Sequence, residues 1–177
     1  MKKNKKQSNI DFRFMSFFFK IRDKFHPPIN KIRKANIKLG DIVLDYGCGS
    51  GSYTIAAIEE LGPNGKVFAA DIHPLALEKI IKKAERMGYT NIETIQTDCA
   101  TGLDDESIDK VMCFDVLHDI PNKNDILKEF YRVLKPNATL SFDDHHMNED
   151  EITDFITSKR LFKLAEKKDK QYNFIKI

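Results

Sequence analysis

Three glycines at alternate positions follow a short apolar run in the sequence. The segment reads Asp45-x-Gly47-x-Gly49-x-Gly51 and comes directly after the β-branched and apolar residues 42–44. Glycines at this spacing let the backbone turn sharply and let a ligand lie against bare main chain. The loop also leads into a helical pattern, and a helix N-terminus favours an anionic group. The spacing predicts a ligand-binding turn, although a glycine-rich turn without a ligand is the alternative when the loop is taken alone.

The loop departs from the fingerprint of a nicotinamide-dinucleotide site. That fingerprint is Gly-x-Gly-x-x-Gly or Gly-x-Gly-x-x-Ala, whereas Ser52 stands in its last position here. The fingerprint also lacks an acid two residues before its first glycine, where this chain has Asp45. These differences predict that the loop does not bind NAD.

Two further acids stand at the ends of apolar, strand-like runs. Asp71 comes 20 residues after Gly51, where a carboxylate can accept both hydroxyls of a ribose. Asp98 follows the next run, where an acid or its neighbours can meet the edge of an adenine. A single Asp at a strand end is commonly a turn former. Three acids in register with the glycine loop, Asp45 included, favour a ligand site instead.

The elements that must position these residues alternate between strand and helix. Strands are predicted at residues 42–44, 66–70, 92–96, 110–114 and 138–142, and helices at residues 53–61, 74–87, 125–134 and 149–157. Such alternation predicts right-handed βαβ units and a parallel sheet covered on both faces. In a sheet of this kind, ligands bind beyond the carboxyl ends of the strands, where the acids and glycines stand.

Two more strands, at residues 161–166 and 172–177, flank the charged turn of residues 167–170. They predict a hairpin added to the parallel sheet. The fold class is therefore α/β: a Rossmann-like, mostly parallel seven-stranded sheet with helices on both faces and a C-terminal antiparallel hairpin. A chain of 177 residues suits one such domain, which we expect at residues 40–177 after an N-terminal helical extension at residues 1–39.

Five segments resemble the successive motifs of class I S-adenosylmethionine-dependent methyltransferases. They are residues 43–51 (VLDYGCGSG), 70–74 (ADIHP), 98–100 (DCA), 114–118 (FDVLH) and 132–137 (RVLKPN). The combination is specific, whereas any one motif is not. The resemblance covers residues 38–142 and is closest to the small-molecule branch that includes the enzymes of ubiquinone and menaquinone biosynthesis. It implies S-adenosylmethionine as cofactor and a small molecule as methyl acceptor.

The resemblance also implies which residues surround the cofactor. Its amino-acid part would be held by Asp45 and by the loop residues Gly47, Cys48, Gly49 and Gly51. Its ribose would be bound by Asp71. Its adenine would be flanked or lined by Ile72, His73, Asp98 and Cys99. The sulfonium and the substrate would be faced by Asp115, Val116 and His118.

The chemistry itself requires little from the protein. A sulfonium methyl is already activated, so holding the nucleophile in line and close supplies most of the rate. An acceptor whose pKa is near or above neutrality also needs a base, for which histidine is the usual residue. His118 stands where the family places its reacting centre, together with Asp115, so we take both as catalytic candidates. A structural, hydrogen-bonded role for His118 remains equally open.

The sequence after the fourth strand bears on the class of acceptor. The amino-methylating and nucleic-acid branches of the family often carry Asn/Asp-Pro-Pro-Tyr/Phe there, whereas this chain has Asp115-Val116-Leu117-His118. The formal net charge is only +2, which argues against a nucleic-acid partner. A small-molecule acceptor is favoured over a protein or RNA. The remaining alternative is a regulatory module that binds S-adenosylmethionine without turnover.

No metal site is predicted. The Asp143-Asp144-His145-His146 run has suitable ligand types, but neighbouring residues on an extended strand alternate faces, so a polar pocket rim is favoured. The three cysteines form an odd set without metal-ligand spacing, and they indicate free thiols in a reducing compartment. With no secretory signal, the expected location is the cytoplasm.

The N-terminal segment is dense in aromatic residues. Phe12, Phe14, Phe17, Phe18, Phe19 and Phe25 alternate with the basic residues Arg13, Lys20, Arg22 and Lys24. This pattern is consistent with a lid over the cofactor, with weak membrane-surface contact through residues 1–25, or with plain core packing. Lys2, Lys3, Lys5 and Lys6 before it are expected to form a solvated terminus. The oligomeric state is not predicted.

Overall fold

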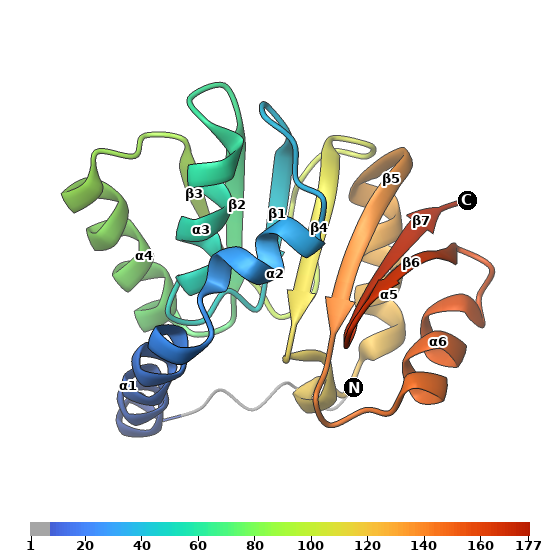
Figure 1. Cartoon of the computed structure of the whole chain (residues 1–177), viewed down its shortest axis with the longest axis horizontal. Helices are drawn as coiled ribbons and strands as arrows, with labels where there is room; N and C mark the ends of the chain where they lie inside the picture. Colours follow the sequence, from blue (N-terminus) through green and yellow to red (C-terminus); the bar gives the residue numbers. More distant parts are fainter. Residues whose placement is uncertain (1–7) are drawn as a thin grey trace.

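A seven-stranded sheet forms the centre of the computed structural model, which describes residues 8–177 apart from the side chains of Arg13, Met15 and Lys20 (Figure 1). The strands are β1 (Ile42–Tyr46), β2 (Lys66–Asp71), β3 (Ile92–Gln96), β4 (Ile108–Phe114), β5 (Leu134–Asp143), β6 (Phe162–Lys168) and β7 (Gln171–Lys176). Their order is β3-β2-β1-β4-β5-β7-β6. The strands β1 to β5 pair in parallel, and β7 pairs antiparallel to both β5 and β6. The predicted fold class, including its C-terminal hairpin, is confirmed.

Helices cover both faces of this sheet. Successive strand residues point to opposite sides, so strands that are apolar throughout have two faces to bury. The helices are α1 (Asn9–Phe25), α2 (Pro28–Lys34), α3 (Ser52–Leu61), α4 (Pro74–Met87), α5 (Lys123–Val133) and α6 (Glu149–Thr157), with the 3₁₀ helix η1 (Leu117–Asp119). Val43 of β1 packs into one core with α2 and α3, whereas its neighbour Leu44 packs into a second core with α5 and α6. Both faces are therefore apolar and buried, as parallel sheets require.

The predicted and observed elements differ most where α5 meets β5. The helix ends at Val133, one residue earlier than predicted, and the strand begins at once with Leu134 and includes Pro136. Leu134 is fully buried and pairs with Ile108, and the β4–β5 register shifts directly after this pair. The local sequence pattern predicts that the helix includes Leu134 and that the strand begins at residue 138. Burial of Leu134 in the sheet outweighs this pattern.

Within residues 8–39 the structure contains the two helices α1 and α2. In Figure 1, α1 lies at the lower left, below α3 and α4, and α2 crosses in front of the sheet. Ile32 and Ala35 are fully buried in the core beside α3, and Lys110 Nζ donates a hydrogen bond to the Ala35 carbonyl at 2.6 Å. The division at residue 39 stays a prediction, but α2 shares a core with the sheet. The predicted solvated tip at residues 2–6 lies outside the described residues.

Among residues 8–177, no helix is both long enough and apolar enough to cross a membrane. The three cysteines are free, as predicted from their number and spacing. Cys48 and Cys113 are buried, and burial raises the pKa of each thiol well above its usual value. Neither thiol is therefore an activated nucleophile at neutral pH.

Candidate active site

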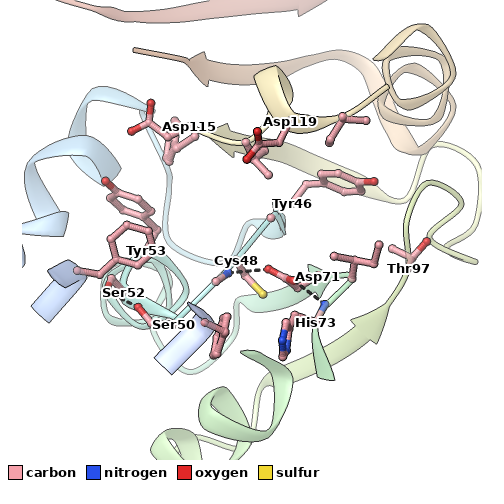
Figure 2. Close-up of a pocket in the computed structure, with 18 of the residues that line it drawn as sticks. Tyr46, Cys48, Ser50, Ser52, Tyr53, Asp71, His73, Thr97, Asp115 and Asp119 are labelled. Atoms are coloured by element: carbon pink, nitrogen blue, oxygen red, sulfur yellow. Dashed lines mark hydrogen bonds between the residues drawn. The ribbon is translucent and has the colours of Figure 1, made fainter. Parts of the chain in front are cut away.

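A pocket opens at the carboxyl ends of β1, β2, β3 and β4, and α1 forms part of its wall (Figure 2). The predicted site residues that line it are Gly47, Cys48, Gly49, Asp71, Ile72, His73, Asp98, Asp115 and Val116. The structure thus brings the ends of four strands, from Tyr46 to Phe114 in the chain, around one hollow. Four predicted residues do not line the pocket, namely Asp45, Gly51, Cys99 and His118.

Asp71 ties the glycine loop to the end of β2. Its carboxylate accepts hydrogen bonds from the backbone N–H groups of Gly49 at 2.9 Å and His73 at 2.8 Å. Burial raises the pKa of Asp71, and this effect outweighs the two hydrogen bonds, which lower it. Asp71 therefore shapes the loop in addition to facing the pocket, where a ribose was expected to bind.

Gly51 does not line the pocket but lies where α3 begins, packed against α4. It is the N-cap of α3 in a left-handed conformation with φ of 77°. A Cβ atom on this residue would stand 2.5 Å from Ile80 Cγ1 of α4, so no side chain fits there. Its place in the motif is therefore explained by close packing of α4 against the start of α3.

Asp45 lies beneath the glycine loop. Its side chain is buried and accepts a hydrogen bond from Thr54 Oγ1 at 2.6 Å, which joins β1 to the first turn of α3. Burial raises the pKa of Asp45 to about 7, with a smaller upward contribution from the nearby Asp71 charge. The predicted contact of Asp45 with the cofactor stays a prediction: the residue does not line the pocket, and its carboxylate is directed to Thr54.

The raised pKa of Asp45 predicts a pH-dependent stability. In the unfolded chain its pKa returns to about 3.8, so between pH 4 and 7 the folded state binds more protons and the free energy of unfolding falls as pH rises. Urea titrations should show Asp45→Asn removing roughly 2 kcal/mol of this fall between pH 5 and pH 8. Equal pH slopes for Asp45→Asn and the wild type would contradict the assignment.

Cys99 and His118 lie just outside the pocket wall. Cys99 is packed at the edge of the core after β3, where its backbone N–H donates to Thr97 Oγ1 at 3.1 Å. His118 belongs to η1, whose following residues Asp119 and Ile120 do line the pocket. The roles expected of these two residues stay predictions, and at this wall their positions are taken by the neighbouring residues Asp98 and Asp119.

His118 is held by a buried carboxylate from a different strand end. Its Nδ1 lies 3.0 Å from both oxygens of Asp144, and its backbone N–H donates to Asp144 at 2.9 Å. The Asp144 side chain has no exposed surface. When Nδ1 donates to this carboxylate, the neutral ring has its acceptor at Nε2, which lies 3.5 Å from Asp119 Oδ2.

Asp115 is the centre of a polar cluster after β4. Its φ is 53°, a conformation that is uncommon for a residue with a side chain. Its Oδ1 accepts hydrogen bonds from the backbone N–H and the ring Nδ1 of His145 at 2.9 and 2.6 Å, and Lys31 Nζ lies 3.9 Å from Oδ2. Burial alone raises the pKa of Asp115, but the His145 bonds and Lys31 outweigh it, so the pKa is lowered.

Two residues of the 143–146 run meet Asp115. Donor atoms of Asp115, Asp144 and His145 lie within 4.8 Å of one another, a spacing that could hold a metal ion. Strand β5 ends at Asp143, so the alternation of faces does not apply to Asp144 and His145. Asp115 and His145 already bond each other, Asp144 bonds His118 instead, and Lys31 supplies a positive charge, so a polar rim is the simpler description.

Several lining residues were not among the site residues predicted from the sequence. They are Phe12, Phe19, Arg22, Tyr46, Ser50, Ser52, Tyr53, Thr97, Phe114, Asp119 and Ile120. Arg22 stacks over the rings of Phe19 and Tyr53, at 4.6 and 5.2 Å from their centroids. The hydroxyl of Ser52 donates to Asp23 of α1. The available signals were the aromatic density of residues 12–25, which suggested a lid, and the positions next to the glycines.

Comparison with known protein families agrees with this geometry. Residues 37–176 match the family model described as a methyltransferase domain. The chain belongs to this family. It is an S-adenosylmethionine-dependent methyltransferase domain, and S-adenosylmethionine is its cofactor. The family named by the sequence motifs is therefore confirmed.

Individual relatives of the methyltransferase domain align with only part of this chain. A demethylmenaquinone methyltransferase of Lactobacillus johnsonii is 35% identical over 108 residues, which are 60% of this chain and 44% of the relative. An arsenic(III) S-adenosylmethionine methyltransferase structure from Chlamydomonas reinhardtii is 35% identical with a TM-score of 0.56, covering 62% of this chain and 40% of that one. The chain spans about half the length of the curated relatives it matches.

A solved structure of similar size resembles the methyltransferase domain over most of its length. It is a SAM-dependent methyltransferase from Aquifex aeolicus, with a TM-score of 0.77, covering 85% of this chain and 90% of that chain. The two sequences are 20% identical. This likeness establishes the fold.

Proposed function

We propose that the protein transfers the sulfonium methyl of S-adenosylmethionine to a small-molecule acceptor. The observation that carries this proposal is a pocket lined by two kinds of residue. The glycine loop, Asp71 and Asp98 suit the cofactor, and the aromatic residues Phe19, Tyr53 and Phe114 line the same pocket together with Asp115. An aromatic wall with few polar groups is typical of a site for a flat, largely apolar compound.

The acceptor we infer is a ring compound of the size of a quinone head group. The Lactobacillus johnsonii relative is named for demethylmenaquinone, and Tyr53 and Phe114 of this chain form an edge-to-face pair at 5.2 Å beside the pocket. Lys31 Nζ lies over both rings, at 5.3 and 5.2 Å from their centroids, and makes an ion pair with Asp143. Lys31 does not itself line the pocket, so the aromatic pair is the part of this arrangement that supports a ring compound.

The test combines cofactor binding with methyl transfer. Calorimetry should show binding of S-adenosylmethionine and S-adenosylhomocysteine but not of NAD. Incubation with methyl-labelled cofactor and a short-chain demethylmenaquinone should then yield labelled product, identified by mass spectrometry. Cofactor binding without transfer to any tested small molecule would favour the regulatory module, and transfer to protein or RNA alone would favour a macromolecular acceptor. Absence of cofactor binding would overturn the proposal.

His118 is proposed to act in turnover more than in cofactor binding. If Nε2 accepts the proton of the acceptor, His118→Ala should lower kcat by about 100-fold or more with little change in the Kd of the cofactor. Asp144→Asn should lower kcat less and shift the pH profile, because it changes only the group that holds the ring. Unchanged kcat across the pH range in both variants would assign His118 to structure.

A further inference from the structure

The outer face of α1 carries a stripe of exposed apolar side chains. They are between 43% and 79% exposed, and they are Ile10, Phe14, Phe17, Phe18, Ile21 and Phe25. Since each residue turns an α-helix by about 100°, these six positions fall within an arc of about 100° on the helix surface. We call this set the outer stripe. The rings of Phe14 and Phe17 each contact that of Phe18, at centroid distances of 4.9 and 6.2 Å, so the stripe is more than a set of single exposed apolar residues, which are common on any protein.

The inner face of the same helix contacts the domain and lines the pocket. Phe12 is buried and stacks on His73 of the pocket wall at a centroid distance of 4.5 Å. Ser16 is buried, and Phe19 and Arg22 line the pocket. Turning the outer stripe toward the sheet would break these contacts. The stripe is therefore not core packing, which was one of the alternatives that the sequence left open.

Positive charge is concentrated in the segment that carries the stripe. Residues 1–26 contain eight Lys and Arg against two Asp, a formal charge of +6. Residues 27–177 contain 21 Lys and Arg against 25 Asp and Glu, a formal charge of −4. Lys24 of α1 is exposed beside the stripe. A small overall charge thus conceals a basic, aromatic segment attached to a mildly acidic domain.

We propose that the outer stripe docks onto the surface of an anionic phospholipid membrane. A helix with an apolar face and nearby basic charge lies in the plane of the interface, with its aromatic rings among the headgroups and its charges attracted by anionic lipid. This orientation requires no membrane-spanning helix. A second copy of the chain is a poorer occupant, because two segments of charge +6 repel each other at a shared interface.

Docking brings the cofactor pocket close to the bilayer. The inner and outer faces of α1 are separated by one helix diameter, about 10 Å, so the pocket lies about that far from the lipid. A lipid-tailed acceptor could then reach the pocket without leaving the membrane surface. The docking itself does not depend on the identity of the acceptor or on methyl transfer.

A fluorescence experiment tests the docking directly. The chain contains no tryptophan, so Phe17→Trp introduces a single reporter in the outer stripe. Vesicles of phosphatidylcholine and phosphatidylglycerol should shift its emission to the blue, and added salt should reverse the shift; vesicles of phosphatidylcholine alone should have little effect. Leu39→Trp, at a position that is 82% exposed outside α1, is the matched control and should not respond. A response from Leu39→Trp equal to that from Phe17→Trp, or none from either, would overturn the proposal.

A second set of variants separates docking from folding and from the cofactor site. Phe14→Ser, Phe17→Ser and Phe18→Ser combined should weaken co-sedimentation with anionic vesicles by at least about 10-fold, since three of the rings that enter the interface are removed. The same variant should keep the wild-type melting temperature and Kd for S-adenosylmethionine, since none of the three residues lines the pocket. Leu39→Ser with Ile81→Ser, two exposed apolar residues elsewhere, is the control and should sediment like the wild type. Undiminished sedimentation of the triple variant, or a wild-type dimer that the triple variant abolishes without any vesicle binding, would refute membrane docking.

Discussion

Gly49→Val is expected to abolish S-adenosylmethionine binding while the domain stays folded. The φ of Gly49 is 51°, and a Cβ atom there would meet no atom nearer than Phe19 Cε2 at 3.8 Å. The two methyl groups of valine would extend from this position into the pocket that both residues line. We expect the affinity to fall at least about 100-fold, roughly 3 kcal/mol at about 1.36 kcal/mol per factor of ten. Calorimetry measures this loss, and circular dichroism checks the fold.

The control for this variant is Gly88→Val. Gly88 ends α4 in the same left-handed region, with φ of 76°, and no heavy atom lies within 4 Å of its added Cβ. Both valines carry backbone strain of about 1–2 kcal/mol, so both variants should lose similar stability. Only Gly49→Val should lose the cofactor. Native-like circular dichroism with wild-type affinity in Gly49→Val would show that the cofactor does not lie against this loop.

Asp71→Ala is expected to have the second largest effect on cofactor affinity. The change removes the proposed acceptor for two ribose hydroxyls and also leaves the N–H groups of Gly49 and His73 without their partner. A loss of roughly 1–3 kcal/mol is expected, which corresponds to about a 10- to 100-fold rise in Kd. Asp71→Asn, which keeps one acceptor oxygen, should fall between the wild type and Asp71→Ala.

Affinity should also depend on pH through Asp71. Burial raises its pKa, so the carboxylate takes up a proton at a higher pH than an exposed Asp does. The protonated group is a poorer acceptor for hydroxyls, and the affinity for the cofactor should therefore fall as pH is lowered through that pKa.

The control for Asp71→Ala is Asp41→Ala. Asp41 lies away from the pocket, where its carboxylate accepts a hydrogen bond from the backbone N–H of Lys38 at 2.9 Å. If Asp41→Ala weakened binding as much as Asp71→Ala, a direct role of Asp71 toward the cofactor would be excluded.

The sequence by itself determined the sheet and the place of the site within it. Alternation of apolar runs and helical patterns predicts βαβ units, whose handedness and pairing leave few arrangements. Strand ends are local features, so the glycines and acids that follow them can be assigned to one edge of the sheet from the sequence alone. The pocket residues from Gly47 to Val116 lie at that edge for this reason.

The direction of individual side chains was decided by tertiary structure. Asp45 stands in the motif, yet its carboxylate turns to Thr54, because the start of α3 packs over the end of β1. His118 is held by Asp144, which is 26 residues away in the chain. Their contact exists because β4 and β5 end side by side, and no local pattern records which residue of the 143–146 run turns inward.

The N-terminal helix shows the same division. The sequence indicates a helix rich in aromatic residues, and these occur on both of its faces. A helical pattern alone cannot say which face meets the protein, since Phe12 and Phe14 are equally apolar. Only the docking of α1 against His73 and the glycine loop decides that Phe12 and Phe19 border the pocket while Phe14, Phe17 and Phe18 face solvent. The physical reason is that this choice depends on shape complementarity with residues distant in the chain, which hydrophobic periodicity does not contain.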